Sequence, residues 1–393
     1  MRKTSFTTLF RLQYSQQIMQ FIAGMLLAVG IVTFRLSQLL PGVNSLEHKT
    51  INSGRTIAAI RQDPINLPYK VAVWLAHKLD VRNPTNFRYI SIAIGLFCLI
   101  VFFIVVRRWF GFWVSAVSSL MLLTSSWFLH LIRLAAPDVG QLSVMVLIGF
   151  GLWLKSHRWP YAALVVGVGL TALSLYVPGL FWIMLIGIIH QRHYIARTMK
   201  QTKWLMPLAS IMLAALLAPL IWQTILSPKL ALTVFGLPTS LDAAKAIFGS
   251  LVSLPSHLFW HGPNDASLWL PGTPLLDYLS AVLAVLGLYN FVQYRQLDRS
   301  KLTLGFLLAG LVLSVLTSST LLGFLLPIVY ILIASGLAFM INQWLTVFPR
   351  NPFARGLMIV LIALAVSSVS YYQLSHYFLA WARHPETRAS FKP

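Results

Sequence analysis

The sequence predicts an all-α protein: a polytopic bundle of transmembrane helices with further short helices at the outer membrane surface. Hydrophobic residues make up 58% of the 393 residues, charged residues make up 10%, and mean hydropathy is +0.75. A soluble domain carries about 25% charged residues. Apolar stretches long enough to cross a bilayer as helices recur along the whole chain. Together these observations indicate an integral membrane protein.

We expect about eleven spans in a single integral membrane domain that covers residues 1–393. The spans lie at roughly 18–40, 89–106, 112–132, 141–154, 160–176, 177–190, 204–226, 275–293, 302–318, 320–341 and 356–373. The fifth and sixth are short and adjoin at Val177. The first is too long for the apolar region of a cleavable signal peptide, and no small-residue cleavage site follows it.

The distribution of charge predicts the orientation. Cytoplasmic segments of membrane proteins carry an excess of Lys and Arg. If the N-terminus is cytoplasmic, only Asp298 of the nine acids lies inside, and the outside acids are Glu47, Asp63, Asp80, Asp138, Asp242, Asp265, Asp277 and Glu386. We interpret the net charge of +21 as topology and attraction to anionic lipid, not as nucleic-acid binding. Acids contribute little to the topology rule, so the outside acids need another explanation.

Two outside segments are long, and a third forms the C-terminal tail. Segment 41–88 is predicted to contain a weak helix over 45–62 and a plainer amphipathic helix over 66–80, with Leu67, Val71, Trp74, Leu75 and Leu79 facing the headgroup boundary and Lys70, His77 and Lys78 on another face. Segment 227–274 shows no strong periodicity and is rich in Pro, Gly, Trp and His, which predicts an ordered, functional loop. The tail, 374–393, is expected to be mobile at its end.

Candidate chemistry lies at the outer surface, because the spans are almost free of ionisable residues. Glu47 follows the first span and Asp138 precedes the fourth, so both can face one outer cavity. The nearby basic residues are His48, Lys49, Arg55, Arg61, Arg88 and Arg133. A carboxylate can act as a base toward a hydroxyl, and guanidinium and ammonium groups can hold a phosphate. Such a set suits transfer of a group from a lipid phosphate.

Simpler interpretations of the same residues stay open. Glu47 can begin a surface helix, where an acid favours the helix dipole, and Asp138 can cap the fourth span. Arg133 can anchor a helix end at the interface. His257 and His261 can be ordinary loop residues, and Trp260 suits the membrane interface.

The order of these features resembles the GT-C superfamily of membrane glycosyltransferases, which includes protein O-mannosyltransferases and aminoarabinose transferases. The likeness is best over residues 18–180. "LPGVNSLEHKT" is similar to the family's acidic motif after the first span, and "TSSWFLHLIRLAAPDVG" to the segment with an aspartate in the second outer loop. "DPINLPYKVAVWLAHKL" resembles its juxtamembrane helix, and "FRYISIAIGLFCLIVFFIVVRRWFG" its second span. The family's acidic pair is usually Asp-Glu, and here it is Leu46-Glu47.

The resemblance implies an inverting glycosyltransferase that uses a polyprenyl-phosphate sugar and a lipid, glycan or protein acceptor, with its active site at the outer face of the cell membrane. It implies Glu47 as the base and Asp138 as its assistant. Lys49, Arg55, Arg88 and Arg133 would bind the donor phosphate, and His257, Trp260 and His261 would belong to a loop over the substrate. A divalent metal stays open, with Glu47, Asp138 and His48 as possible ligands. Two alternatives stay open as well: a flippase or transporter for lipid-linked sugars, and an inactive GT-C-like assembly subunit, which Leu46 in the acidic pair favours.

Overall fold

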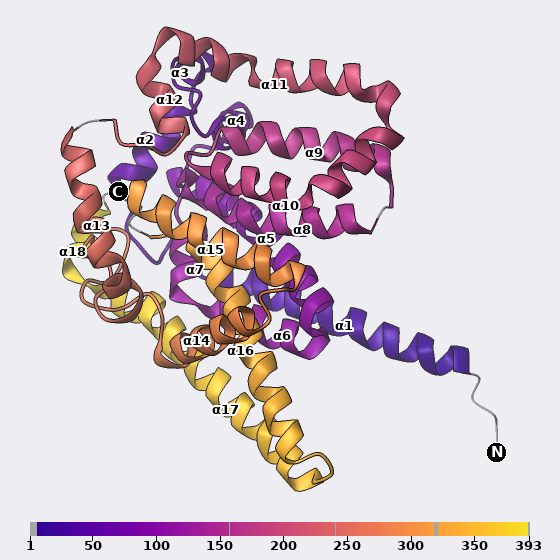
Figure 1. Ribbon diagram of the computed structural model, residues 1–393. Coiled ribbons are helices and arrows are strands. Elements are labelled where there is room, and N and C mark those ends of the chain that lie inside the picture. The colour runs from indigo at the N-terminus through magenta and orange to yellow at the C-terminus, as the bar shows by residue number, and fades with distance from the viewer. Residues whose placement is uncertain (1–5, 157, 240, 318–320, 392–393) are drawn as a thin grey trace.

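The computed structural model describes residues 6–156, 158–239, 241–317 and 321–391, and within these ranges it contains helices and no strands (Figure 1). The α-helices are α1 (Phe6–Thr33), α2 (Ser45–Ser53), α3 (Ile57–Gln62), α4 (Leu67–Lys78), α5 (Arg88–Phe110), α6 (Phe112–Thr124), α7 (Ser126–Ile132), α8 (Ser143–Lys155), α9 (Pro160–Leu175), α10 (Leu180–Gln201), α11 (Met206–Leu226), α12 (Pro228–Val234), α13 (Leu241–Phe259), α14 (Tyr278–Gln293), α15 (Asp298–Leu316), α16 (Leu325–Val347), α17 (Pro352–Ser375) and α18 (Pro385–Ser390). Shorter helical turns are η1 (Pro84–Phe87), η2 (Pro137–Leu142), η3 (Lys203–Leu205) and η4 (His376–Trp381).

The predicted membrane bundle is confirmed, and within the described residues each of the eleven expected regions contains a helix. In the described residues, seven helices are long and apolar enough to span a membrane, or eight if α6 and α7, bent by 65°, form one span. The other expected spans differ in length or polarity. Helices α9 and α14 are short, and α10 is longer than expected and ends in the polar stretch "HQRHYIARTMKQ".

The first span ends earlier than expected. Helix α1 stops at Thr33 and not near residue 40, and Arg35, expected inside the helix, lies beyond it with a left-handed φ of 48°. Apolar residues continue beyond it at Phe34, Leu36, Leu39 and Leu40, so the apolar pattern does not reveal this end.

The core is centred on α16, which is almost fully buried from Leu325 to Ala338. Helices α14 and α16 cross at two glycines. A Cβ on Gly287 would lie 1.8 Å from the Leu332 carbonyl oxygen, and a Cβ on Gly336 would lie 2.0 Å from that of Leu283. Small residues allow this backbone approach, which is how helices commonly associate in membranes.

Helices α2, α3 and α4 lie together at one end of the bundle, which we call the site end (Figure 1). The expected helix over 45–62 is broken at Gly54, where a Cβ would lie 2.6 Å from the Val73 side chain. A helix is present at the second expected region, 66–80, as α4, in which Val71 and Leu75 are exposed while Val73 is buried against the bundle. Lys70 departs from the expected polar face, because it is buried and its Nζ lies 2.7 Å from Asp63 Oδ2.

Segment 227–274 is more regular than expected, because it contains α12 and the 19-residue α13. Pro255 lies inside α13, and in the sequence it reads as a helix breaker. After α13, Trp269 is fully buried and donates from Nε1 to the Thr273 carbonyl at 2.7 Å. The C-terminal tail packs on this segment: Trp381 Nε1 and Thr387 Oγ1 both donate to the Ala266 carbonyl, at 3.0 and 2.9 Å. The tail up to Phe391 is therefore part of the bundle.

Candidate functional site

Glu47 is held at the start of α2 by its own helix. The Asn44 side chain accepts a hydrogen bond from the Glu47 amide at 2.8 Å, and Glu47 Oε2 accepts one from the Asn44 amide at 3.1 Å. This reciprocal capping box satisfies donors that a helix start otherwise leaves unpaired. The simpler interpretation of Glu47 as a helix-starting acid is therefore observed.

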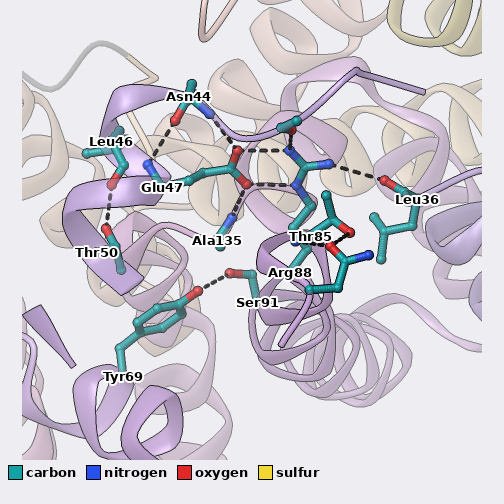
Figure 2. A network of polar contacts seen from close by, with 12 residues as sticks. Leu36, Asn44, Leu46, Glu47, Thr50, Tyr69, Thr85, Arg88, Ser91 and Ala135 are labelled. Carbon is teal, nitrogen blue, oxygen red and sulfur yellow. Dashed lines mark hydrogen bonds and ion pairs between the residues drawn. The ribbon is translucent and has the colours of Figure 1, made fainter. Parts of the chain in front are cut away.

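A buried ion pair occupies the rest of the Glu47 carboxylate (Figure 2). Arg88 donates from Nε to Oε1 at 2.7 Å and from Nη2 to Oε2 at 2.9 Å. The Ala135 amide adds a bond to Oε1 at 2.9 Å. Each carboxylate oxygen thus accepts two hydrogen bonds, and Glu47 and Arg88 are 0% and 2% exposed as side chains. Both groups face each other and not a cavity.

Arg88 and Arg133 hold the chain that follows α1. Arg88 also donates from Nη1 to the Leu36 carbonyl at 3.2 Å and from Nη2 to the Gly42 carbonyl at 2.7 Å. Arg133 donates from Nη2 to the Phe34 carbonyl at 2.7 Å. Burial lowers the pKa of Arg133. Two of the four expected phosphate-binding residues are thus buried and bonded to backbone carbonyls.

The Arg133 guanidinium also stacks on aromatic rings, with its Cζ 5.1 Å from the Tyr377 ring centroid and 4.7 Å from that of Phe378. These cation–π contacts join the chain after α7 to the C-terminal tail. Tyr69 is buried on the other side of α2, where it hydrogen-bonds Ser91 across 2.8 Å, and burial raises its pKa.

Asp138 lies in different surroundings. It lines a cavity of about 310 Å³ at the site end, whose walls are Leu46, Asn66, Pro137, Asp138, Gln141, Val177, Pro178, Leu268, Thr317 and Leu321. Within the described residues Asp138 forms no ion pair, and its nearest side-chain partner is Gln141 Nε2, 3.5 Å from Oδ1. Asp138 does not cap a helix, because the N-cap of η2 is Ala136 and no side chain caps it. Its carboxylate faces an open space without a cation.

A second cavity, of about 370 Å³, lies on the other face of α2. Its walls are His48, Ile51, Asn52, Arg55, His77, Asp80, Val81, Arg82, Pro84 and Phe87. Arg82 pairs with Asp80 at 2.7 Å, while His48 and Arg55 are exposed at its rim. Leu46 lines the first cavity and His48 the second, so α2 contributes a residue to each.

The remaining expected residues lie apart from these cavities. Lys49 is exposed on α2 and lines neither cavity. Trp260 and His261 are exposed, His257 is half-buried with a pKa lowered by burial, and none of them lines either cavity. In the part of the chain that is described, no group of three or more His, Cys, Asp or Glu side chains could hold a metal ion. Glu47, Asp138 and His48 accordingly do not converge.

Sequence reasoning missed the polar partners of Asp138 in the first cavity. Gln141 follows Asp138 by three residues, and this spacing within a polar break between apolar stretches is a signal that the sequence contains. Asn66 and Thr317 come from distant parts of the chain and carry no such signal. The Gln141 Oε1 atom is buried without a partner among the described residues, which leaves an acceptor beside the cavity.

Known proteins match this chain in their solved structures and not in their sequences. No family model matches the sequence, and no curated protein matches it. Among solved structures, the chain is similar to ArnT from Cupriavidus metallidurans, crystallised in the apo state, with a TM-score of 0.56 and 13% sequence identity over 95% of this chain and 77% of that one. The expected fold class, an all-helical multi-pass bundle, is borne out by this likeness to the ArnT fold. At this identity the likeness establishes the multi-pass membrane fold, and the chemistry must be argued from the residues.

Proposed function

We propose that this protein is an inverting membrane glycosyltransferase, which moves a sugar from a polyprenyl-phosphate donor to a lipid, glycan or protein acceptor. The observation that carries the proposal is the Asp138 carboxylate, which lines the first cavity and has no cationic partner among the described residues. A base needs a free lone pair within reach of the proton that it accepts. Asp138 meets this requirement.

We assign the base to Asp138 and a positioning role to Glu47, contrary to the order that the sequence favours. Both oxygens of Glu47 are already occupied by hydrogen-bond donors. One of these donors, the Ala135 amide, belongs to the segment that leads directly into η2. Glu47 therefore fixes the backbone three residues before Asp138, and through it the placement of the base.

The walls of the first cavity suit a sugar. Asn66, Gln141 and Thr317 offer amide and hydroxyl groups, which hydrogen-bond to sugar hydroxyls, and Leu46, Val177 and Leu268 offer apolar contact. No Lys or Arg lines it. The donor phosphate would instead meet two exposed cations, Lys49 on α2 and Arg55 just after it, with His48 beside them.

The reaction proceeds by displacement at the anomeric carbon. The acceptor hydroxyl oxygen attacks that carbon while Asp138 takes the hydroxyl proton. The bond between the anomeric carbon and the phosphate oxygen breaks, and polyprenyl phosphate leaves with the bonding electrons. The configuration at the anomeric carbon inverts. A divalent metal has no side-chain cluster to bind among the described residues, so Lys49 and Arg55 would balance the charge of the leaving phosphate.

The proposed location is the cell membrane, with a cytoplasmic N-terminus and the site end at the outer surface. Support comes from the acids, since Glu47 and Asp138 lie at the site end and Asp63 and Asp80 follow its helices α3 and α4, while the basic ends of α5 and α8 lie opposite.

The test is transfer of a labelled sugar from polyprenyl phosphate by the purified chain in lipid nanodiscs. Asp138→Asn keeps the size of the side chain and should lower the transfer rate by about 10²–10⁴, the range for loss of a general base. The matched control is Glu386→Gln, which removes an exposed acid from α18. Full transfer by Asp138→Asn would reject this residue as the base.

A second candidate function is a GT-C-like binding or assembly subunit. The Glu47 carboxylate favours this second function, because both of its oxygens already accept hydrogen bonds within the protein and it therefore has a structural role. Tight binding of polyprenyl phosphate without transfer by the unmodified protein would support this second candidate over the first.

A further inference from the structure

An apolar cavity lies toward the end of the bundle opposite the site end. Helix α8 begins beside η2 and Asp138 and ends at Lys155, and the cavity is built from the half near Lys155. It has a volume of about 240 Å³ and is lined by residues of α8, α9, α10, α11 and α15, among them Phe150, Leu164, Met184, Gln191 and Phe306. Figure 1 shows α8, α9, α10 and α11 running alongside one another in this part of the molecule.

The cavity is accessible from the side of the bundle. Two of its lining residues on α10, Ile188 and Met199, are 38% and 41% exposed, so its wall continues onto the surface. Helix α11, which forms another wall, is almost entirely exposed and apolar, as expected of a lipid-facing helix. An apolar space of this size does not hold water, and its lining lacks dispersion contacts until a hydrocarbon chain enters it.

One polar group stands inside this apolar space. Gln191 lines the cavity, is only 5% exposed, and its Oε1 atom has no hydrogen-bond partner among the described residues. Gly151 makes room for it: a Cβ there would lie 3.0 Å from Gln191 Nε2. A buried amide oxygen without a partner indicates that a ligand with a polar region completes the site.

Basic side chains lie close in sequence to the lining residues on the exposed side of the cavity, which we call its mouth. Arg192 precedes the lining residues Ile195 and Met199 at helical spacing, and Lys203 precedes the lining residue Met206 by three positions. Both Arg192 and Lys203 are exposed, and neither forms an ion pair in the described ranges. Lys155 differs, because it pairs with Asp298 at 2.8 Å. The mouth therefore offers two cations to an anionic group.

We propose that this cavity binds an anionic glycerophospholipid. One acyl chain fills the apolar space, Gln191 contacts the polar glycerol region, and Arg192 and Lys203 bind the phosphate. The inference does not depend on the proposed transfer reaction, because the site lies at the other end of the helices. The proposed lipid site gives a role to the polar end of α10, which is too polar to lie inside a membrane.

The test compares two synthetic lipids added to the delipidated full chain in detergent: dioleoyl phosphatidylglycerol and dioleoyl phosphatidylcholine. Native mass spectrometry counts bound lipid, and the apparent melting temperature reports stabilisation. The unmodified protein should retain phosphatidylglycerol and prefer it over phosphatidylcholine by roughly 10- to 30-fold, the size expected of two basic side chains beside an anionic head group. Equal retention of both lipids would reject an anionic site.

Two variants separate the parts of the site. Gly187→Leu places a side chain in the cavity, and its Cβ fits, because the nearest atom is Phe306 Cζ at 3.5 Å. It should abolish the thermal shift given by phosphatidylglycerol. The double variant Arg192→Gln with Lys203→Gln should bring the lipid preference close to one, while Arg350→Gln, an exposed cation beyond α16, should keep it. An undiminished thermal shift in Gly187→Leu, or an unchanged preference in the double variant, would overturn the proposal.

Discussion

Glu47 and Arg88 form a bidentate ion pair across 41 residues of sequence, with Arg88 Nε 2.7 Å from Glu47 Oε1 and both side chains buried. The pair joins the start of α2 to the start of α5. Through the Ala135 amide and the Leu36 and Gly42 carbonyls it also holds the chain before η2 and the chain after α1. One carboxylate and one guanidinium thus organise the site end without facing its cavities.

Breaking this pair should destabilise the protein strongly. Glu47→Gln leaves the buried Arg88 charge without its counterion, and loss of one partner of a buried pair costs about 3–5 kcal/mol. We expect a clear fall in the apparent melting temperature of the purified chain. Asp80→Asn is the matched control, because it breaks the Asp80–Arg82 pair, whose side chains are 73% and 85% exposed. Exposed pairs contribute little. A Glu47→Gln protein as stable as the control would disprove the structural role.

Arg55 and Arg133 should behave differently, although both were expected to bind phosphate. Arg133→Ala removes the hydrogen bond to the Phe34 carbonyl and the stacking on Tyr377 and Phe378, so it should lower the free energy of unfolding by about 1–3 kcal/mol. Arg55→Ala removes an exposed side chain and should leave the melting temperature unchanged. In the transfer assay it should raise KM for the donor by roughly tenfold. Unchanged donor kinetics would remove Arg55 from the proposed phosphate site.

Helix positions could be predicted from the sequence, because a membrane helix needs a long apolar stretch and the chain shows each one. Helix ends that depend on distant residues could not. Helix α1 ends at Thr33, and the carbonyl of the next residue, Phe34, accepts a hydrogen bond from Arg133, which lies 99 residues later in the sequence. Helix α13 was not expected, because segment 227–274 shows no strong periodicity in the sequence; in the structure Pro255 is accommodated within this helix.

The candidate site could be predicted only in part, for the same physical reason. That Glu47 and Asp138 lie at the same end follows from their places at span ends. The hydrogen bonds that Arg88 and Ala135 donate to the Glu47 carboxylate could not be predicted, because they depend on how the helices pack. Residue types alone cannot distinguish a carboxylate in a buried ion pair from one that faces a cavity. The two acids at this end differ in that respect.

The crossing of α14 and α16 should tolerate no side chain. At Gly336 any Cβ would overlap the Leu283 carbonyl, so Gly336→Ala should force the helices apart and lower the yield of folded protein. Gly356→Ala in α17 is the control, since nothing lies within 4 Å of the position of its Cβ. Alanine favours a helix over glycine, so this control should be neutral or stabilising. Equal yields and melting temperatures for the two variants, measured by fluorescence-detected size exclusion, would contradict the close crossing.

The proposed orientation gives the last prediction. Asn52 is exposed on α2 at the site end, and Thr346 is exposed near the end of α16 at the opposite end. The native Cys98 is buried, so it contributes little background labelling. If the site end is outside, Asn52→Cys should react with a membrane-impermeant maleimide in intact cells, and Thr346→Cys should react only after the cells are opened. The charge asymmetry is the reason for this expectation, because basic helix ends stay on the cytoplasmic side. The reverse pattern would place Asp138 and its cavity in the cytoplasm, where an acceptor at the outer surface could not reach it.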